Sequence, residues 1–325
     1  MTTKPFSDRI AESTKRANSV LVAGIDPDVE SIPEQFIAQA ASRSLNDEDF
    51  FHSLIVSFYQ ESLSPITGLL AAVKPNLAFF ERYGLGGLRA YRSLRDWCHE
   101  HNLAVIADAK RGDIGSTAAA YGHAFLQEKK ILGRAPHAFV ADALTVNPFL
   151  GFDTIEPFLA AAEATNAGLF ILVRTSNPGS ADLQSIEFSS AAEQSRIMNV
   201  SDRIAEWINS NAHRLQGTCG VSGLGAVVGA THPDELLRLR SLMPSTLFLI
   251  PGYGAQGGSA EDIKGGRRSA GDGVLVNSSR GLFAKIPSAY SIAECVECVR
   301  QRAITAHADL SVLQNGLHSH GEISG

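Results

Sequence analysis

Acidic and basic side chains gather in the segment AVIADAKRGDIGSTAAAY, residues 104–121. Asp108 and Lys110 are two residues apart, so at the end of a β-strand both side chains would point the same way. Asp113 follows after a turn, and the flanking residues are apolar or small. Because a buried charge costs several kcal/mol unless it is paired, we expect these groups to pair with one another and with Lys74. The segment therefore predicts a network of two cations and two anions.

A network of this kind can do acid–base chemistry at one point. At about 4 Å and an effective dielectric constant of about 20, each contact carries roughly 4 kcal/mol of Coulomb energy. The network would hold the ammonium group of Lys110 protonated and in a fixed direction. Such an ammonium can stabilise a developing carbanion and then protonate it.

A second group of residues predicts a phosphate site. The stretch PGYGAQGG, residues 251–258, lets backbone amides approach a ligand without obstruction by side chains. The stretch VNSSRG, residues 276–281, supplies Ser279 and Arg280. Backbone N–H groups favour an anion, and an arginine can clamp its oxygens. The glycine-rich and charged segment 257–273 is expected to be a mobile lid or, alternatively, an ordinary flexible loop.

The rest of the chain supplies elements that would bring these residues together. Roughly eight short apolar runs each end in a polar residue or a Gly/Pro cluster and precede a helical pattern. This alternation predicts parallel strands, and about eight such units predict a single-domain (β/α)₈ barrel. A doubly wound open sheet is the alternative, but the first turn, GIDPDVESIPEQ, lacks the glycine fingerprint of a dinucleotide fold.

In a barrel, the C-terminal ends of the strands converge on one face, where sites are built. Each predicted strand delivers a polar residue to that face: Asp26, Lys74, Asp108, Lys110, Asn147, Ser176, Gln256 and Arg280. We place the barrel in residues 1–308, with an insertion over about 179–199. The polar tail, residues 309–325, is expected to be weakly ordered.

Composition excludes several classes of protein. The chain has 325 residues, of which 44% are hydrophobic, and a net charge of −6, which argues against a general nucleic-acid binder. The sequence contains no run of about 18 apolar residues, so we expect no membrane span. The N-terminus lacks a signal-peptide pattern, and we therefore expect a cytoplasmic protein. The four cysteines do not suggest a disulfide scaffold, and no metal site is expected.

The motifs resemble, in order, those of the orotidine 5′-phosphate decarboxylases, and most closely the longer bacterial-type branch. DAKRGDIGST and PGYGAQGG carry most of the resemblance. AGIDPD, VKPN, TVNPFLG, RTSNPG, VVGAT and NSSRG extend it from about residue 18 to residue 300. The resemblance implies a (β/α)₈ barrel that works as a homodimer. It also implies conversion of orotidine 5′-phosphate to UMP and CO₂ without a metal or an organic cofactor.

The resemblance also implies a role for each matching residue. Lys110 would donate the proton to C6 of the pyrimidine, Asp108 would lie beside the substrate carboxylate, and Lys74 would bridge Asp108 and the ribose. Asp113 would reach into the partner subunit's site, with Thr117 nearby. The substrate-binding residues would be Asp26 at the ribose, Ser176 and Pro178 at the pyrimidine, Gln256 and Arg280 at the phosphate, and also Asn147, Thr117 and Ser279.

The same residues are compatible with two other functions. Barrel relatives that act on sugar phosphates, such as 3-keto-gulonate-6-phosphate decarboxylase and hexulose-phosphate synthase, also carry D-x-K-x-x-D but use Mg²⁺. A non-catalytic barrel that binds a phosphate ligand is the other alternative. The four charged residues argue against it, because a pure binder has no need of a buried charged network.

Overall fold

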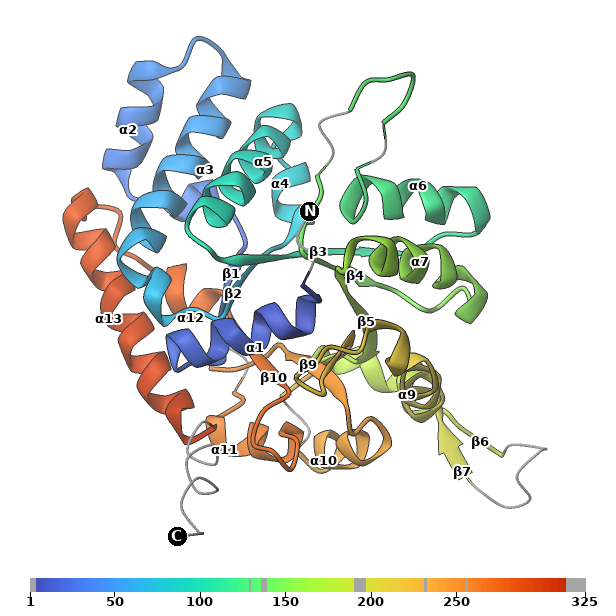
Figure 1. Ribbon diagram of the computed structural model, residues 1–325. Coiled ribbons are helices and arrows are strands. Elements are labelled where there is room, and N and C mark those ends of the chain that lie inside the picture. Colours follow the sequence, from blue (N-terminus) through green and yellow to red (C-terminus); the bar gives the residue numbers. More distant parts are fainter. Residues whose placement is uncertain are drawn as a thin grey trace, which may run out of the picture.

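The computed structural model describes residues 4–128, 130–135, 139–189, 197–230, 233–254 and 257–313. Its centre is a closed barrel of eight parallel strands in the order β1-β2-β3-β4-β5-β8-β9-β10, with β10 pairing back to β1 (Figure 1). The prediction of a (β/α)₈ barrel is confirmed, and the open sheet is excluded. The barrel strands are β1 (Leu21–Ile25), β2 (Ala72–Pro75), β3 (Ala104–Arg111), β4 (Ala143–Val146), β5 (Gly168–Arg174), β8 (Ser222–Val228), β9 (Thr246–Ile250) and β10 (Val274–Ser278).

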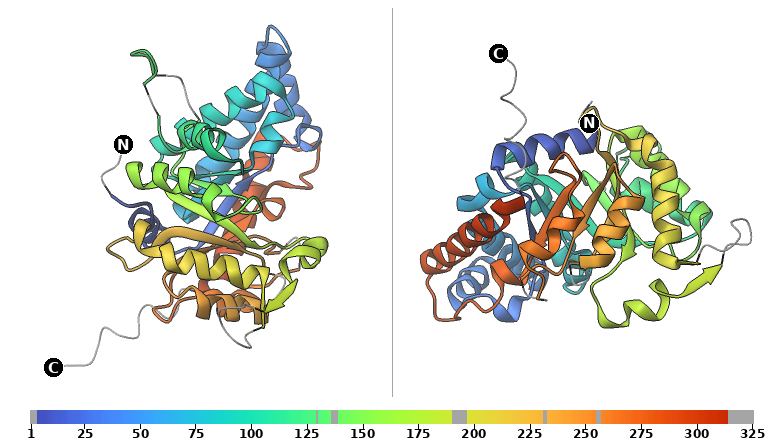
Figure 2. Two further views of the ribbon diagram at one scale, coloured as in Figure 1. Left: turned by 90° about the vertical axis from the view of Figure 1, so that its right-hand side faces the viewer. Right: turned by 90° about the horizontal axis from the view of Figure 1, so that it is seen from below.

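Helices surround the barrel, as both views in Figure 2 show. Those predicted from the sequence patterns after the strands are present, together with several shorter ones. They are α1 (Phe6–Ala17), α2 (Glu34–Arg43), α3 (Asp47–Leu63), α4 (Leu77–Glu81), α5 (Gly84–Glu100), α6 (Gly115–Phe125), α7 (Glu156–Thr165), α8 (Ala181–Gln184), α9 (Val200–Asn211), α10 (Pro233–Leu242), α11 (Ala260–Ile263), α12 (Arg280–Phe283) and α13 (Ile292–Leu310).

The interior of the barrel is apolar in one layer and polar in the next. The apolar layer is fully buried and includes Val22, Ala72, Ile106, Ala143, Phe170 and Leu275. Side chains two positions apart on a strand face the same side. The residues two positions further toward the strand ends therefore also face inward: Gly24, Lys74, Asp108, Thr145 and Asn277. This alternation places the polar layer at the C-terminal ends of the strands, which we call the mouth.

Helix α1 closes the opposite end of the barrel, and the sequence analysis did not predict it. The ring of Phe6 packs edge-on against Phe170, with 6.0 Å between the ring centroids. Gly168 makes this possible, because a Cβ there would lie 2.3 Å from the Phe6 ring. The Asp8 carboxylate accepts hydrogen bonds from the backbone N–H groups of Thr218 (3.0 Å) and Cys219 (2.8 Å). Helix α1 is thus anchored at this end by both apolar and polar contacts.

The predicted insertion contains a short antiparallel hairpin, β6 (Glu187–Ser189) and β7 (Ile197–Asn199), that projects from the barrel (Figure 1). At its end, Asn199 begins α9 with a reciprocal capping box to Asp202. At the C-terminus, α13 and a 3₁₀ turn over 311–313 continue past the predicted boundary at residue 308, and Leu310 and Leu313 are buried. The rest of the predicted tail, residues 314–325, lies outside the described residues.

The segment predicted as a lid is packed from Ser259 onward. Ser259 begins α11 with a capping box to Asp262, and Ile263 is fully buried. Arg240 of α10 donates to the carbonyl oxygens of Gly266 (2.7 Å) and Gly273 (3.0 Å). These contacts attach the part from Ser259 onward to α10, and the mobility expected over 257–273 stays a prediction.

Candidate active site

The mouth of the barrel holds a carboxylate between two ammonium groups. Asp108 Oδ2 lies 2.5 Å from Lys74 Nζ, and Asp108 Oδ1 lies 2.6 Å from Lys110 Nζ. Lys74 and Asp108 are both 6% exposed, whereas the side chain of Lys110 is 47% exposed. We call these three residues the Lys–Asp–Lys cluster. Its geometry leaves Lys110 as the member that a molecule entering the mouth can reach.

The electrostatics of the cluster keep Asp108 ionised. Burial of the Asp108 carboxyl group acts to raise its pKa, but the charges and hydrogen bonds of Lys74 and Lys110 outweigh burial. The pKa of Asp108 is therefore held well below its ordinary value. The carboxylate stays negative at neutral pH, and it fixes both ammonium groups in return.

The fourth member of the predicted network does not join this cluster. Asp113 makes no ion pair with Lys74 or Lys110 of the same chain, and its Oδ1 instead accepts a hydrogen bond from the backbone N–H of Ile114 (2.8 Å). It lies half-buried in the loop before α6, and Thr117 is exposed in the first turn of that helix. The sequence analysis placed Asp113 after a turn and grouped it with the lysines, whereas its carboxylate is bonded within its own loop.

Arg111, the second cation of the opening segment, faces away from the mouth. Its guanidinium pairs with Glu81 of α4 and lies over the rings of Tyr121 (5.4 Å) and Phe125 (5.6 Å). Arg111 therefore attaches the end of β3 to the helices outside the barrel. Its neighbour Lys110 points inward because the two side chains leave the strand on opposite faces.

A second polar group lies across the mouth, at the ends of β1 and β10. Ser279 Oγ donates to Asp26 Oδ2 at 2.6 Å. The other carboxylate oxygen of Asp26 and the side-chain oxygen of Asn277 are buried, and neither has a hydrogen-bond partner among the described residues. Gly24 is essential to this packing, because a Cβ there would lie 2.7 Å from Ser279 Cβ. The arrangement leaves two acceptor oxygens unsatisfied at the mouth.

The remaining predicted residues follow the ends of other strands. Asn147 follows β4 and is exposed, and its Oδ1 accepts from the N–H of Phe149 (3.0 Å). After β5, Ser176 is half-buried, and a Cβ on Gly229 would lie 3.1 Å from its Cα, so the two loops touch. Pro178 is exposed on the same loop, and Arg280 is exposed at the start of α12.

The glycine-rich turn after β9 is held by its own backbone. Gly254 N donates to Gly258 O (2.8 Å), and Gly257 N donates to Gly254 O (2.9 Å). Gly254 and Gly257 have φ angles of 69° and 92°, which a residue with a side chain rarely adopts. The turn is tight and free of large side chains at these positions. Gln256, the predicted phosphate residue in this turn, lies outside the described residues.

Three residues of the mouth escaped the sequence analysis: Gly24, Thr145 and Asn277. Thr145 is 1% exposed, and its hydroxyl donates to Asp108 Oδ1 at 3.0 Å. The signal that could have found these residues is the same two-residue alternation. Each lies two positions beyond a fully buried interior residue of its strand, as Lys74 and Asp108 do.

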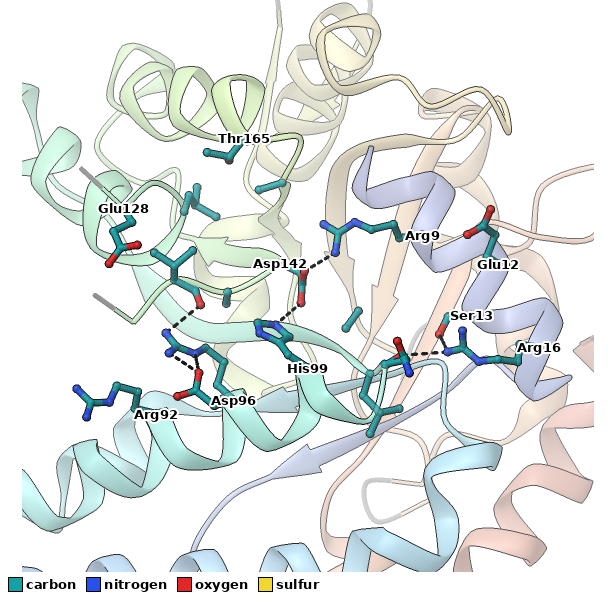
Figure 3. A pocket seen from close by; sticks show the side chains of 18 residues that line it. Arg9, Glu12, Ser13, Arg16, Arg92, Asp96, His99, Glu128, Asp142 and Thr165 are labelled. Carbon is teal, nitrogen blue, oxygen red and sulfur yellow. Dashed lines mark hydrogen bonds and ion pairs between the residues drawn. The ribbon is translucent and has the colours of Figure 1, made fainter. Parts of the chain in front are cut away.

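A cavity of about 920 Å³ lies at the opposite end of the barrel, between α1, α5 and the start of β3. Figure 3 shows that several of its side chains pair with one another. Asp142 pairs with Arg9, lies 2.9 Å from His99 Nε2 and accepts from the backbone N–H of Val105 (2.8 Å). Burial opposes ionisation of Asp142, but His99 and Arg9 lower its pKa to about 2. These contacts connect three elements at the closed end of the barrel.

The described residues were also compared with the requirements of a metal site, a disulfide and a membrane-spanning helix. Among them, no group of three or more His, Cys, Asp or Glu side chains is placed to hold a metal ion. The four cysteines are free thiols, of which Cys98 and Cys295 are buried. No helix in the described part of the chain is both long enough and apolar enough to cross a membrane.

The fold and the mouth together define a class of protein: a (β/α)₈ barrel that carries paired lysine and aspartate side chains at the C-terminal ends of its strands, where the enzymes of this fold have their active sites. The sequence profile of the orotidine 5′-phosphate decarboxylase / HUMPS family matches residues 61–290. The chain belongs to this family.

Individual relatives agree with the family match. The curated orotidine 5′-phosphate decarboxylase of Caldicellulosiruptor bescii is 38% identical over 279 residues, covering 86% of this chain and 89% of that protein. The enzyme of the same name from Rhodopirellula baltica is 37% identical over 289 residues, covering 89% and 91%. The solved structure of Leishmania donovani OMP decarboxylase superposes with a TM-score of 0.69 at 27% identity, covering 96% of this chain and 99% of that one.

Proposed function

We propose that this chain decarboxylates orotidine 5′-phosphate to UMP and CO₂ and that Lys110 is its proton donor. The observation that carries the proposal is the Lys–Asp–Lys cluster. Its buried carboxylate fixes Lys110 Nζ at 2.6 Å, while the Lys110 side chain remains 47% exposed at the mouth. We infer the substrate from the family to which the chain belongs, and we infer the proton donor from the geometry of the cluster.

The reaction breaks the bond between C6 of the pyrimidine and its carboxylate, and the electron pair stays on C6. Little resonance is available there, so the negative charge must be stabilised by the site. An ammonium that is already oriented meets this charge without reorganisation, and then transfers one proton from Nζ to C6. CO₂ leaves, UMP remains, and the neutral Lys110 regains a proton from water. No metal or organic cofactor is needed in this sequence of steps.

The other predicted residues hold the rest of the nucleotide. Asp26, fixed by Ser279, has a free carboxylate oxygen that suits a ribose hydroxyl. Arg280, exposed at the mouth, suits the phosphate together with Gln256 and the backbone amides of the glycine-rich turn. Ser176 and Pro178 suit the pyrimidine, and Asn147 lines the same face. Binding energy from the phosphate, which is remote from C6, can be used to close the turn over the substrate.

An absorbance assay for loss of orotidine 5′-phosphate tests the proposal. We expect the wild type to be active and Lys110→Ala to lose about three orders of magnitude or more in kcat. Binding of UMP should change by less than about tenfold, because UMP no longer carries the reacting group. A wild type with no turnover would refute the reaction, and an active Lys110→Ala would refute the role of Lys110. Activity that survives EDTA excludes the Mg²⁺-dependent sugar-phosphate chemistry.

The protein is further proposed to work as a homodimer in which Asp113 and Thr117 complete the partner's site. In one chain, apolar side chains are exposed beside the mouth: Ile114 is 63%, Phe149 74% and Leu150 51% exposed. They stand in the loops after β3 and β4, which are joined by a hydrogen bond from Asn147 N to Arg111 O (2.8 Å). Apolar surface of this kind is typical of an interface.

Mixing two inactive variants tests the shared site. A hybrid dimer of Lys110→Ala and Asp113→Ala would contain one site with both residues intact. After exchange at equal amounts, we expect about a quarter of wild-type activity to return, because half of the dimers are hybrids with one intact site. No recovery in mixtures shown by mass to contain hybrids would refute the sharing of Asp113.

The cytoplasm is the proposed compartment, because all four cysteines are free thiols, as is usual under reducing conditions. Cell fractionation with an antibody to the protein tests this, and recovery outside the cytoplasmic fraction would contradict it.

A further inference from the structure

We propose that Thr145 is a positioning residue that sets both the direction of the Asp108 carboxylate and the backbone of Lys110. Thr145 is buried at the end of β4, facing the mouth. Its Oγ1 donates to Asp108 Oδ1 at 3.0 Å and accepts from the backbone N–H of Lys110 at 2.9 Å. A hydroxyl has one proton to donate and lone pairs to accept, so both bonds can exist at once.

The backbone of β3 needs such a partner because its register breaks at this point. Ala107 pairs with Leu144, but Arg111 pairs with Val146, so β3 carries two more residues than β4 over the same stretch. Within this bulge, Lys110 has a φ angle of 47°, in the left-handed region that costs a residue with a side chain about 1–2 kcal/mol. The Thr145 hydroxyl replaces a main-chain acceptor for Lys110 N–H.

The same hydroxyl also contacts the carboxylate of the Lys–Asp–Lys cluster. Asp108 Oδ1 accepts from Lys110 Nζ and from Thr145 Oγ1, so the hydroxyl fixes the oxygen that fixes the ammonium. Thr145 therefore acts on Lys110 from both ends of the residue, through its amide and through its side-chain partner. A misplacement of about 1 Å in a reacting group can cost about a hundredfold in rate. Thr145 need not touch the substrate to control the reaction.

The experiment compares Thr145→Val, which removes the hydroxyl at nearly constant shape, with Thr145→Ser, which keeps it. Thr246→Val is the matched control, because Thr246 is also a buried strand residue, but its hydroxyl has no hydrogen-bond partner among the described residues. For Thr145→Val we expect kcat to fall about 10- to 100-fold while UMP binding changes less than about threefold. Thr145→Ser should recover most of kcat, and Thr246→Val should match the wild type.

The inference rests on the proposed function, and the two fail differently. If the wild type does not turn over orotidine 5′-phosphate, the proposed function fails. If the wild type is active and Thr145→Val keeps kcat within about threefold, only the positioning role fails. A parallel loss of kcat, UMP binding and melting temperature that serine does not rescue would also overturn it, because that pattern belongs to a merely structural residue. A fall in kcat alone, rescued by serine, supports it.

Discussion

Asp108 is the residue on which the two lysines of the mouth depend. It is the only carboxylate in the Lys–Asp–Lys cluster, and its two oxygens are divided between the two ammonium groups. Lys74 is the more buried lysine, with a side chain that is 7% exposed. A buried cation without a partner is far more costly than the pair is favourable. Loss of the Asp108 carboxylate should therefore affect both the stability of the fold and the proposed reaction.

Asp108→Asn should lower both stability and activity. Removing the charge leaves a buried lysine uncompensated, which costs about 3–5 kcal/mol of unfolding free energy. Urea unfolding measures this loss, and the decarboxylation assay should show a fall in kcat. Asp28→Asn is the control, because Asp28 is 49% exposed and lies 3.9 Å from Arg82, a surface pair worth about 0–1 kcal/mol. Equal stability of the two variants would contradict the account of the cluster.

Strands and their junctions decide how precisely the mouth is built. Strand β10 pairs with β1 through Ala23 and Ser278, and the close approach at Gly24 brings Ser279 against Asp26. On the other side, β3 carries a bulge between Ala107 and Arg111, where the Lys110 N–H is bonded by the Thr145 hydroxyl and not by a main-chain acceptor. A close approach of two strands and a bulge thus lie beside the two polar groups of the mouth.

Gly24→Ala tests the junction of β1 and β10. The added Cβ would lie 2.7 Å from Ser279 Cβ and 2.8 Å from Asn277 Oδ1, so the end of β10 must shift. We expect KM for orotidine 5′-phosphate to rise about tenfold, because the Asp26 hydrogen bond is disturbed, with a smaller change in kcat. Gly223→Ala in β8, where the nearest atom would lie 3.5 Å away, should leave both constants unchanged. A normal KM in Gly24→Ala would argue against a substrate contact there.

On the scale of the whole molecule, the two ends of the barrel have different tasks. The mouth carries the charged residues that face a ligand, whereas the opposite end is closed by α1 and by the contacts of Asp142 with Arg9, His99 and Val105. Asp142 lies just before β4, so these contacts connect α1, α5 and β3 around it. The closed end therefore stabilises the barrel, and the proposed chemistry takes place at the other end.

Asp142→Asn should reveal this stabilisation through its pH dependence. The folded pKa of about 2 lies below the ordinary value of 3.8, so the unfolded chain binds the proton first as the pH falls. The stabilisation, on the order of 2 kcal/mol, is present above about pH 4 and is lost between about pH 4 and pH 2. Thermal or urea unfolding should show variant and wild type converging over that range.

Asp96→Asn is the control for this measurement. Asp96 lines the same cavity, but its side chain is 53% exposed, so its pair with Arg95 contributes little. A stability difference for Asp142→Asn that stays constant down to pH 2 would show that the ionised carboxylate is not the stabilising species.

Local pattern was sufficient to predict the barrel and the meeting of Lys74, Asp108 and Lys110. Strand alternation and the convergence of strand ends depend on neighbouring residues alone. Three features followed only from packing between distant segments: the closure by α1, the separation of Asp113 from the cluster, and the Thr145 hydroxyl under Lys110. The physical reason is that β3 carries two more residues than β4 between Ala107 and Arg111, and such a bulge is selected by pairing with a strand distant in sequence, which no local pattern reveals.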